Sequence, residues 1–325
     1  MTGPGADERG PLFTAVVCTH NRAAMAARAV ESLARQTLDT ASYEVVAVDN
    51  ASTDETADAV AAVGRRHPRL SLQVVREGAL GLSHARNAGV AHARGRWVAF
   101  LDDDAVAEPR WLETARECIA SVHPVPLAVG GPILPLFEAP PPPWFHPRYE
   151  TRSWGEEPRW LARGETFSGS NMILSRDLFD RFGGFDPRVG VRGQVLSLGE
   201  ETALFERLWR EGGAERILYY EPRLRVRHSV PPWKMTLGYR FRRCFAAGQA
   251  WYEREGCGRW RWRVPFAAAR LVQLAVLLGE ALWWLPRHPH WRGWMYERVA
   301  VAAVEVGRLL ACLGWKVPVK RLSGC

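Results

Sequence analysis

Short apolar runs alternate with longer amphipathic segments between Leu12 and Gly131. The short runs are rich in β-branched residues and have the length of buried strands; they occupy Leu12–Cys18, Val45–Val48, Leu70–Val75, Trp97–Leu101 and Leu127–Val129. The intervening segments have the apolar spacing of helices and cover 23–36, 54–66, 82–93 and 109–122. Alternating strands and helices predict an α/β fold with a Rossmann-like, mostly parallel sheet flanked by helices.

A proline-rich segment, Pro135–Pro147, follows this alternating region. Proline fixes φ and lacks an amide donor, so the segment is a loop or a stiff polyproline stretch. Two interpretations stay open: a plain connector, or an acceptor-side loop whose flat aromatic surfaces are Trp144, Phe145, Trp154 and Trp160. After it we expect a strand at Phe167–Leu174, a helix at Glu200–Arg210, and strands near Ile217–Tyr220 and Leu224–Arg227.

Two apolar helices are predicted near the end of the chain, at Val264–Leu285 and Arg298–Leu313. Neither segment matches a typical transmembrane helix, because such a helix needs about 20 predominantly apolar residues and polar residues interrupt both segments. The interrupting residues are Arg270, Gln273, Glu280, Glu305 and Arg308. They recur at helical spacing, so each helix has a narrow polar stripe on a wide apolar surface. The helices either pack on the rest of the protein or lie in a membrane surface, which neighbouring arginines favour.

The bulk composition describes a globular protein with a basic excess. The 325 residues exceed one ordinary domain, 47% are apolar and 24% are charged, and the net charge is +8. Arginine is dense after residue 215, which suits phosphate groups on lipids or on a substrate. No nucleic-acid reader motif accompanies that density, so nucleic acid is not the expected partner. The six cysteines lack CxxC spacing and residues 1–10 are polar, which favours a cytoplasmic location.

Three consecutive carboxylates, Asp102, Asp103 and Asp104, directly follow the apolar run that ends at Leu101. Ligands of open α/β sheets gather at the carboxyl ends of the strands. Because the three acids repel one another, we expect a cation between them, and Mg²⁺ or Mn²⁺ shares its oxygen ligands with substrate phosphates. The alternative is an acidic turn that caps the helix after Pro109.

Polar side chains also follow the first two strands. Thr19 and Asn21 can hold a base or ribose, and Asp49 can accept from a base N–H group. Arg86 is predicted on the helix that precedes the acidic triplet, where its guanidinium can bind phosphate or hold the acids in place.

The ordered set of these motifs resembles the family 2 glycosyltransferases of GT-A fold over residues 12 to 250. The motifs are Val16–Arg22, Val48–Asp54, Gly81–Gly89, Phe100–Asp104, Ser168–Leu174, Phe182–Asp186 and Leu198–Leu204 followed by Arg207–Leu208. The resemblance implies an inverting enzyme that moves a sugar from a nucleotide-diphosphate sugar to an acceptor hydroxyl. Such enzymes serve polysaccharide, cell-envelope or glycolipid synthesis, and the implied cofactor is Mg²⁺ or Mn²⁺.

The resemblance also assigns roles to individual residues. Asp49 matches the nucleobase-binding Asp, Asp102 and Asp104 match the DxD motif, and His228 resembles a further metal ligand. Glu200 and Glu201 occupy the family's Glu-Asp position; this chain departs from Asp there, and we expect Glu201 to be the general base. The predicted donor-binding residues are Thr19, Asn21, Arg22, Asp49, Arg86, Asn87, Asp102, Asp103, Ser170 and Asn171.

The expected organisation is a flexible stretch at 1–10, a glycosyltransferase domain at 11–250 and a helical region at 251–325. Within the domain, 11–131 is the nucleotide-binding half and 132–250 the acceptor-side half. The expected acceptor is a glycan or a lipid-linked sugar, with peripheral contact to the inner face of an anionic membrane. Two rivals remain: an inactive glycan- or lipid-binding module, and a nucleotidyltransferase, which needs a Gly-rich basic signature that the first strand lacks. A GxGxxG dinucleotide site is absent from the sequence.

Overall fold

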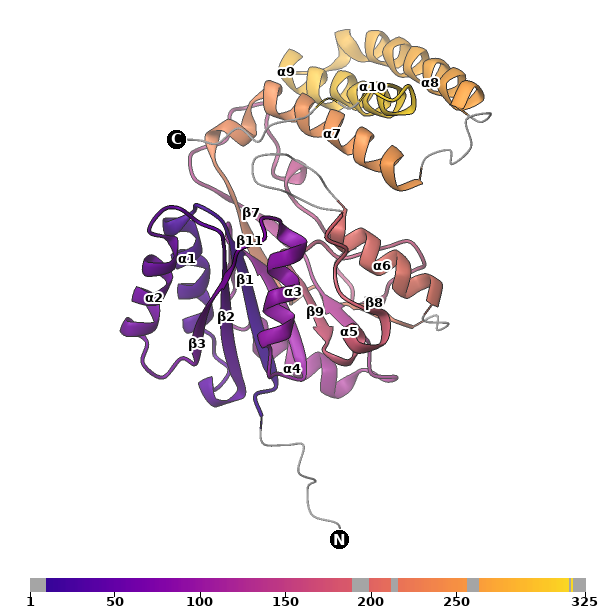
Figure 1. Cartoon of the computed structure of the whole chain (residues 1–325). Helices are drawn as coiled ribbons and strands as arrows, with labels where there is room; N and C mark the ends of the chain where they lie inside the picture. Colours follow the sequence, from indigo (N-terminus) through magenta and orange to yellow (C-terminus); the bar gives the residue numbers. More distant parts are fainter. Residues whose placement is uncertain (1–9, 189–198, 212–215, 256–262, 316, 318–325) are drawn as a thin grey trace. The chain divides into compact units, whose positions relative to one another are not determined.

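The computed structural model describes residues 10–188, 199–211, 216–255, 263–315 and 317 (Figure 1). The stretch 1–9, for which we expected flexibility, lies outside the described residues, as does Leu198 of the last motif. The chain forms two compact units. Unit 1 comprises 10–136, 150–188 and 200–229, and unit 2 comprises 137–149 and the described residues from 230 onward, with Gly199.

An eight-stranded sheet forms the centre of unit 1. Its strands are β1 (Phe13–Thr19), β2 (Tyr43–Asn50), β3 (Leu72–Glu77), β4 (Trp97–Asp102), β6 (Ala128–Gly130), β8 (Arg159–Trp160), β9 (Met172–Ser175) and β10 (Leu218–Tyr220). Their order is β3-β2-β1-β4-β9-β6-β10-β8, and the first four are parallel. Strand β9 runs antiparallel between β4 and β6. The predicted α/β fold is confirmed, with a more mixed sheet than expected.

A small second sheet stands beside the end of β4. It consists of β5 (Ala105–Ala107), β11 (Val226–Val230) and β7 (Ile133–Phe137), in the order β5-β11-β7. Strand β5 begins directly after Asp104, and β11 pairs antiparallel with it, so that His228 is opposite Ala105. This register places His228 beside the acidic triplet, although the two are separated by more than 120 residues in the sequence.

Helices cover both faces of the main sheet (Figure 1). They are α1 (Ala23–Ala34), α2 (Thr56–Arg66), α3 (Leu82–His92), α4 (Trp111–Ser121), α5 (Asp177–Phe182) and α6 (Glu200–Glu211). Side chains of a strand alternate between faces, and β1 shows the result: Phe13, Ala15 and Val17 join the core with α1, α2 and α4, while Val16 joins the core with α5 and α6. The sheet is therefore packed against a helical layer on each face, and this fixes the positions of the strand ends from which the loops begin.

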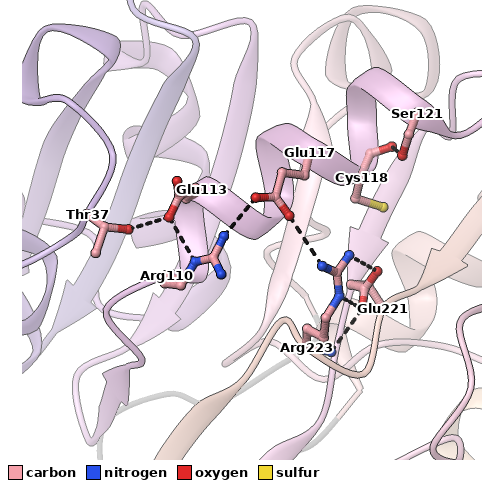
Figure 2. A network of polar contacts seen from close by, with 8 residues as sticks. All are labelled: Thr37, Arg110, Glu113, Glu117, Cys118, Ser121, Glu221 and Arg223. Atoms are coloured by element: carbon pink, nitrogen blue, oxygen red, sulfur yellow. Dashed lines mark hydrogen bonds and ion pairs between the residues drawn. The ribbon is translucent and has the colours of Figure 1, made fainter.

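A chain of ion pairs ties the outer side of α4 to its surroundings (Figure 2). Arg110 bonds Glu113 and Glu117, and Arg223 bonds Glu117 and Glu221, over 2.8 to 3.3 Å. The hydroxyl of Thr37 donates to Glu113 at 2.8 Å. Both arginines are about three-fifths exposed, so water screens these pairs and each contributes little to stability.

Unit 2 is helical. Its helices are α7 (Leu237–Glu255), α8 (Arg263–Trp284), α9 (Trp291–Trp294), a π-helix (Met295–Ala300) and α10 (Val301–Cys312), with short 3-10 turns at Pro232–Met235 and Leu285–Arg287. Helix α10 packs against both α7 and α8. Glycine allows the close approach to α7: a Cβ on Gly248 would lie 2.0 Å from the Val304 carbonyl oxygen, and one on Gly307 would lie 2.3 Å from that of Phe245.

The proline-rich segment supplies part of the core of unit 2. Trp144 and Phe145 are buried beside Val230 and Met235. The Arg240 guanidinium lies 4.5 Å from the Phe145 ring centre, a cation–π distance. These two aromatic rings therefore stabilise the unit and offer no free stacking surface.

The other two aromatic residues expected on the acceptor-side loop, Trp154 and Trp160, lie in unit 1 and differ in exposure. Trp154 is 39% exposed, and Trp160 packs edge-on against Tyr219. Of the four, Trp154 alone keeps a substantially exposed ring, and its indole N–H donates to the Thr166 carbonyl at 3.0 Å.

Candidate active site

The acidic triplet occupies the tight connection between β4 and β5, at the carboxyl end of the parallel strands. Asp102 is the last residue of β4, and its side chain is 31% exposed. Asp102 accepts hydrogen bonds from the Ser170 hydroxyl at 2.5 Å and from Arg86 at 3.3 Å. Asp104 has its backbone carbonyl bonded by the Ser229 amide at 2.8 Å, which joins β5 to β11. The Asp102 carboxylate and the Asp104 backbone are thus held by neighbouring elements.

His228 completes a cluster that fits a divalent metal ion. Its Nε2 lies 2.9 Å from an Asp104 carboxylate oxygen, and one ligand atom each of Asp102, Asp104 and His228 lies within 4.8 Å of the others. Two carboxylates and one imidazole form a donor set suited to Mn²⁺, and with added water or phosphate oxygens also to Mg²⁺. The side chains are 13% to 31% exposed, so solvent and ligand can reach them.

Asp103 turns away from this cluster toward Arg22. The Arg22 guanidinium donates to Asp103 at 2.8 Å and lies 3.7 Å from Asp104. Burial raises the pKa of Asp103, and the Arg22 charge opposes that rise. Arg22 therefore balances the charge of the buried Asp103 and lies within ion-pair distance of Asp104 as well.

Arg86 connects the triplet to the beginning of α6. Its buried guanidinium donates to Glu200 at 3.0 Å and to Asp102 at 3.3 Å, and it lies 3.9 Å from Glu201. It also lies 5.3 Å from the Phe185 ring centre. Burial by itself would lower the pKa of this arginine. The negative charges of Glu200 and Asp102 more than offset that effect, so the net pKa is raised and Arg86 stays charged. One cation thus serves three carboxylates.

The two glutamates at the start of α6 have different environments. Glu200 is buried, and burial followed by repulsion from Glu201 raises its pKa to about 8, against the attraction of Arg86. The Glu201 side chain is 21% exposed. Within the described residues, one oxygen of each carboxylate, Oε2, is buried without a hydrogen-bond partner. Glu200 is therefore largely protonated at neutral pH, and Glu201 is the more accessible of the two.

The loops after β1 and β2 are bonded to each other. Asn21 adopts a left-handed φ of 51°, which asparagine tolerates well. Its backbone N–H donates to Ser52 at 2.9 Å, and its amide oxygen accepts from the Thr53 N–H at 2.8 Å. Buried Asp49 accepts from the Ser52 N–H at 3.1 Å, and Thr19 is buried at the end of β1. The predicted base-binding residues therefore lie together at this edge, with Asn21 fixing the loops.

Two predicted donor-binding residues make hydrogen bonds that hold the backbone. Both ends of the Asn87 amide pair with the backbone of Phe185 at 2.8 Å. Asn171 is fully buried; it donates to the carbonyls of Pro132 and Leu224 and accepts from the Trp111 indole, at 2.7 to 3.0 Å. These contacts position the loops around Phe185 and Ser170.

Two glycines that received no role from the sequence make room for these polar side chains. A Cβ on Gly169 would lie 2.0 Å from an Arg86 guanidinium nitrogen. A Cβ on Gly184 would lie 2.5 Å from the Asn87 amide oxygen. Their positions inside the motifs Ser168–Leu174 and Phe182–Asp186 were the sequence feature that could have indicated a role for these glycines.

Known proteins share parts of this sequence. Residues 14–123 match the model of Glycosyl transferase family 2. The chain is 30% identical over 174 residues to a glucosyl-dolichyl phosphate glucuronosyltransferase of Haloferax volcanii, which covers 52% of this chain and 54% of that protein. It is 41% identical over 106 residues to the succinoglycan biosynthesis protein ExoO of Rhizobium meliloti, covering 33% and 29%. The chain thus spans about half, or less, of the length of these relatives.

Solved structures share the fold over most of the chain. The mannosyltransferase PcManGT from Pyrobaculum calidifontis, in complex with GDP-Man and Mn²⁺, matches with a TM-score of 0.60 and 23% identity, over 93% of this chain and 88% of that one. TarS 1–349 of S. aureus, in complex with UDP, matches with a TM-score of 0.53 and 17% identity, over 96% and 94%. The resemblance seen in the motifs is confirmed as far as these comparisons reach: residues 14–123 match the family 2 model, and the chain has the GT-A fold of known glycosyltransferases.

Proposed function

We propose that the protein transfers a sugar from a nucleotide-diphosphate sugar to an acceptor hydroxyl, with inversion at the anomeric carbon. One observation carries the proposal: the structure joins the Asp102, Asp104 and His228 cluster to Glu200 and Glu201 through the single guanidinium of Arg86. A site that must hold a diphosphate and deprotonate an alcohol needs these two parts side by side.

The donor side is formed by the strand ends. Asp102, Asp104 and His228 would hold Mg²⁺ or Mn²⁺, which when bound neutralises the charge that grows on the departing diphosphate. Arg22 and Arg86 keep the acidic residues in place from either side. Thr19 and Asp49 lie buried at the ends of β1 and β2, where they can contact the base and ribose. The relative in the solved complex is described with GDP-Man and Mn²⁺, which supports this assignment.

The acceptor side depends on Glu201. A base must be ionised at working pH and must reach the hydroxyl proton. Glu200 meets neither demand, because it is buried against Arg86 and its raised pKa keeps it largely protonated. The Glu201 side chain is 21% exposed, and the Arg86 guanidinium lies no nearer to it than 3.9 Å. Glu201 therefore takes the acceptor proton, and a single displacement on the face opposite the leaving group inverts the configuration.

We propose a glycan or a lipid-linked sugar as the acceptor, and a cytoplasmic reaction at the inner face of the membrane. The archaeal relative is named as acting on a glucosyl-dolichyl phosphate, and the rhizobial one as a protein of succinoglycan biosynthesis. These names support an envelope or glycolipid product for this chain.

A donor screen tests the function. The purified protein is incubated with UDP-, GDP- and dTDP-sugars and with Mn²⁺ or Mg²⁺, and free nucleoside diphosphate is measured. We expect release from at least one donor, and Glu201→Gln should lower kcat by roughly 10²- to 10⁴-fold, the usual contribution of a general base. Glu211→Gln, at the exposed end of the same helix, is the control. Donor binding without release would favour the inactive module. Conversion of the nucleotide sugar to a nucleoside triphosphate and a sugar phosphate, on addition of pyrophosphate, would favour a nucleotidyltransferase.

A further inference from the structure

The side of α8 that faces away from the other helices of unit 2 is apolar. Seven of its side chains are 43% to 69% exposed: Val264, Leu271, Val272, Val276, Leu278, Leu282 and Trp283. Ala281 is the one buried residue of this 22-residue helix. A contiguous apolar face of this kind on a folded protein marks an interaction surface.

The charged residue in the middle of α8 points the opposite way. Arg270 donates to Glu305 of α10 at 3.1 Å, and Arg308 donates to the same carboxylate at 2.7 Å. The Glu305 side chain is 8% exposed and that of Arg270 is 24% exposed. Surface helices of water-soluble proteins turn their charges outward and their apolar side inward. In α8 the central charge, Arg270, faces α10 while most side chains of the outward side are apolar, an arrangement that fits an apolar medium outside the helix.

The polar residues of the outward side show how the helix lies in that medium. Gln273 and Glu280 are exposed and seven residues apart, hence close to the same line along the helix. By length and composition, Arg263–Arg287 could cross a membrane. A polar line along one border of the apolar face instead fits a helix that lies in the plane of the membrane, with that line toward water.

The two ends of α8 carry the groups that meet lipid headgroups. Arg263 is exposed at the first end. After the other end, the guanidinium of Arg287, in the following 3-10 turn, lies 4.4 Å from the Trp283 ring centre. In α9, the Arg292 guanidinium lies 5.1 Å from the Trp291 ring centre. Tryptophan concentrates at membrane interfaces, and exposed arginines bind anionic headgroups. This combination favours an anionic bilayer over a protein partner.

We infer that the outward face of α8 docks the protein on an anionic membrane. The apolar side chains around Val272 and Leu282 enter one leaflet, and Arg287 and Arg292 lie among the headgroups. A lipid-linked acceptor would then be presented at the surface on which the enzyme rests.

Vesicle flotation tests this docking and does not require turnover, so it can fail while sugar transfer holds. The full chain is mixed at low salt with vesicles of phosphatidylcholine, with or without phosphatidylglycerol. We expect at least about tenfold stronger binding to the anionic vesicles. Val272→Glu with Leu282→Glu places two charges in the apolar face, at positions that are 65% and 68% exposed, and should lower binding at least about tenfold.

Val125→Glu is the matched control, because Val125 is 53% exposed in unit 1. It should bind vesicles as the unchanged protein does. Circular dichroism and the melting temperature of each variant verify folding. The inference is overturned if the unchanged protein stays in the soluble fraction with both vesicle types, or if the double variant floats equally well. A dimer in sedimentation that the double variant dissociates, without vesicle binding, would assign the face to a second copy of the chain.

Discussion

The guanidinium of Arg86 donates to the carboxylate of Glu200 over 3.0 Å, and both side chains are almost completely removed from water. The same guanidinium also bonds Asp102. Without Arg86, the buried Glu200 carboxyl and the Asp102 carboxylate would lose this donor, and a buried polar group without a partner costs more than its hydrogen bond contributes. Arg86 is therefore both a structural element and the link between the two halves of the site.

Arg86→Ala should lower the free energy of unfolding by about 1–3 kcal/mol, the usual cost of leaving a buried polar group without its hydrogen-bond partner. Glu200→Gln should cost less, because its amide oxygen still accepts from Arg86. Urea denaturation measures both. Arg35→Ala is the control; its side chain is 71% exposed and pairs with Glu31, so it should cost under about 1 kcal/mol. Equal losses for Arg86→Ala and Arg35→Ala would contradict the role of the buried pair.

The raised pKa of Glu200 makes stability depend on pH. Its pKa is about 8 in the folded protein, against an ordinary value of 4.5. Between these values the folded protein keeps a proton that the unfolded chain releases, so this group's contribution to stability is complete below pH 4.5 and is lost as pH rises toward 8. Glu200→Gln should remove a slope of at most about 1.4 kcal/mol per pH unit.

Denaturation curves at pH 5, 6, 7 and 8 test this slope. The difference in unfolding free energy between Glu200→Gln and the unchanged protein should shift in favour of the variant as pH rises. A difference that is constant with pH would show that Glu200 ionises normally.

Gly169→Ala should displace Arg86, because the added Cβ would lie 2.0 Å from its guanidinium nitrogen. We expect kcat to fall at least about tenfold, since displacements near 1 Å within a site already have large effects. Gly10→Ala is the control, because its Cβ would meet only the Arg94 carbonyl oxygen at an ordinary 3.7 Å. Unchanged turnover in Gly169→Ala would mean that the Arg86 position does not matter.

Asn171→Ala should destabilise the protein by about 2–4 kcal/mol, because the Trp111 indole and two buried carbonyls lose their partner. Thermal unfolding measures this loss. At a temperature where the variant is folded, its donor KM should remain within about threefold of the original value. A large rise in KM with full stability would instead restore Asn171 to direct donor binding.

The sequence predicts the parallel half of the sheet well, because each strand there is an apolar run bounded by helices. It fails at β9, where Phe167–Leu174 was expected and Met172–Ser175 is observed. Phe167 is buried like a strand residue, but the backbone between Ser168 and Asn171 forms a turn that approaches Arg86. Apolar patterning does not distinguish a buried turn from a strand.

The site shows a similar division. The acids could be located from their place after β4, whereas His228 came from the family resemblance, because its pairing with β5 is not visible in a linear pattern. Asn87 and Asn171 have polar side chains of the kind that bind ligands. In the structure, however, their amides make hydrogen bonds to backbone groups. Whether a buried amide serves a ligand or a loop depends on what surrounds it in three dimensions.

Calorimetric titration of Mn²⁺ in the presence of a nucleoside diphosphate tests the central claim most directly. Asp104→Ala and His228→Ala should each raise the Kd for the metal at least about tenfold. Asp58→Ala and His92→Ala, which change the same residue types at exposed positions on α2 and α3, should leave it unchanged. Metal binding by Asp104→Ala and His228→Ala as tight as that of the unchanged protein would contradict a metal site at the end of β4.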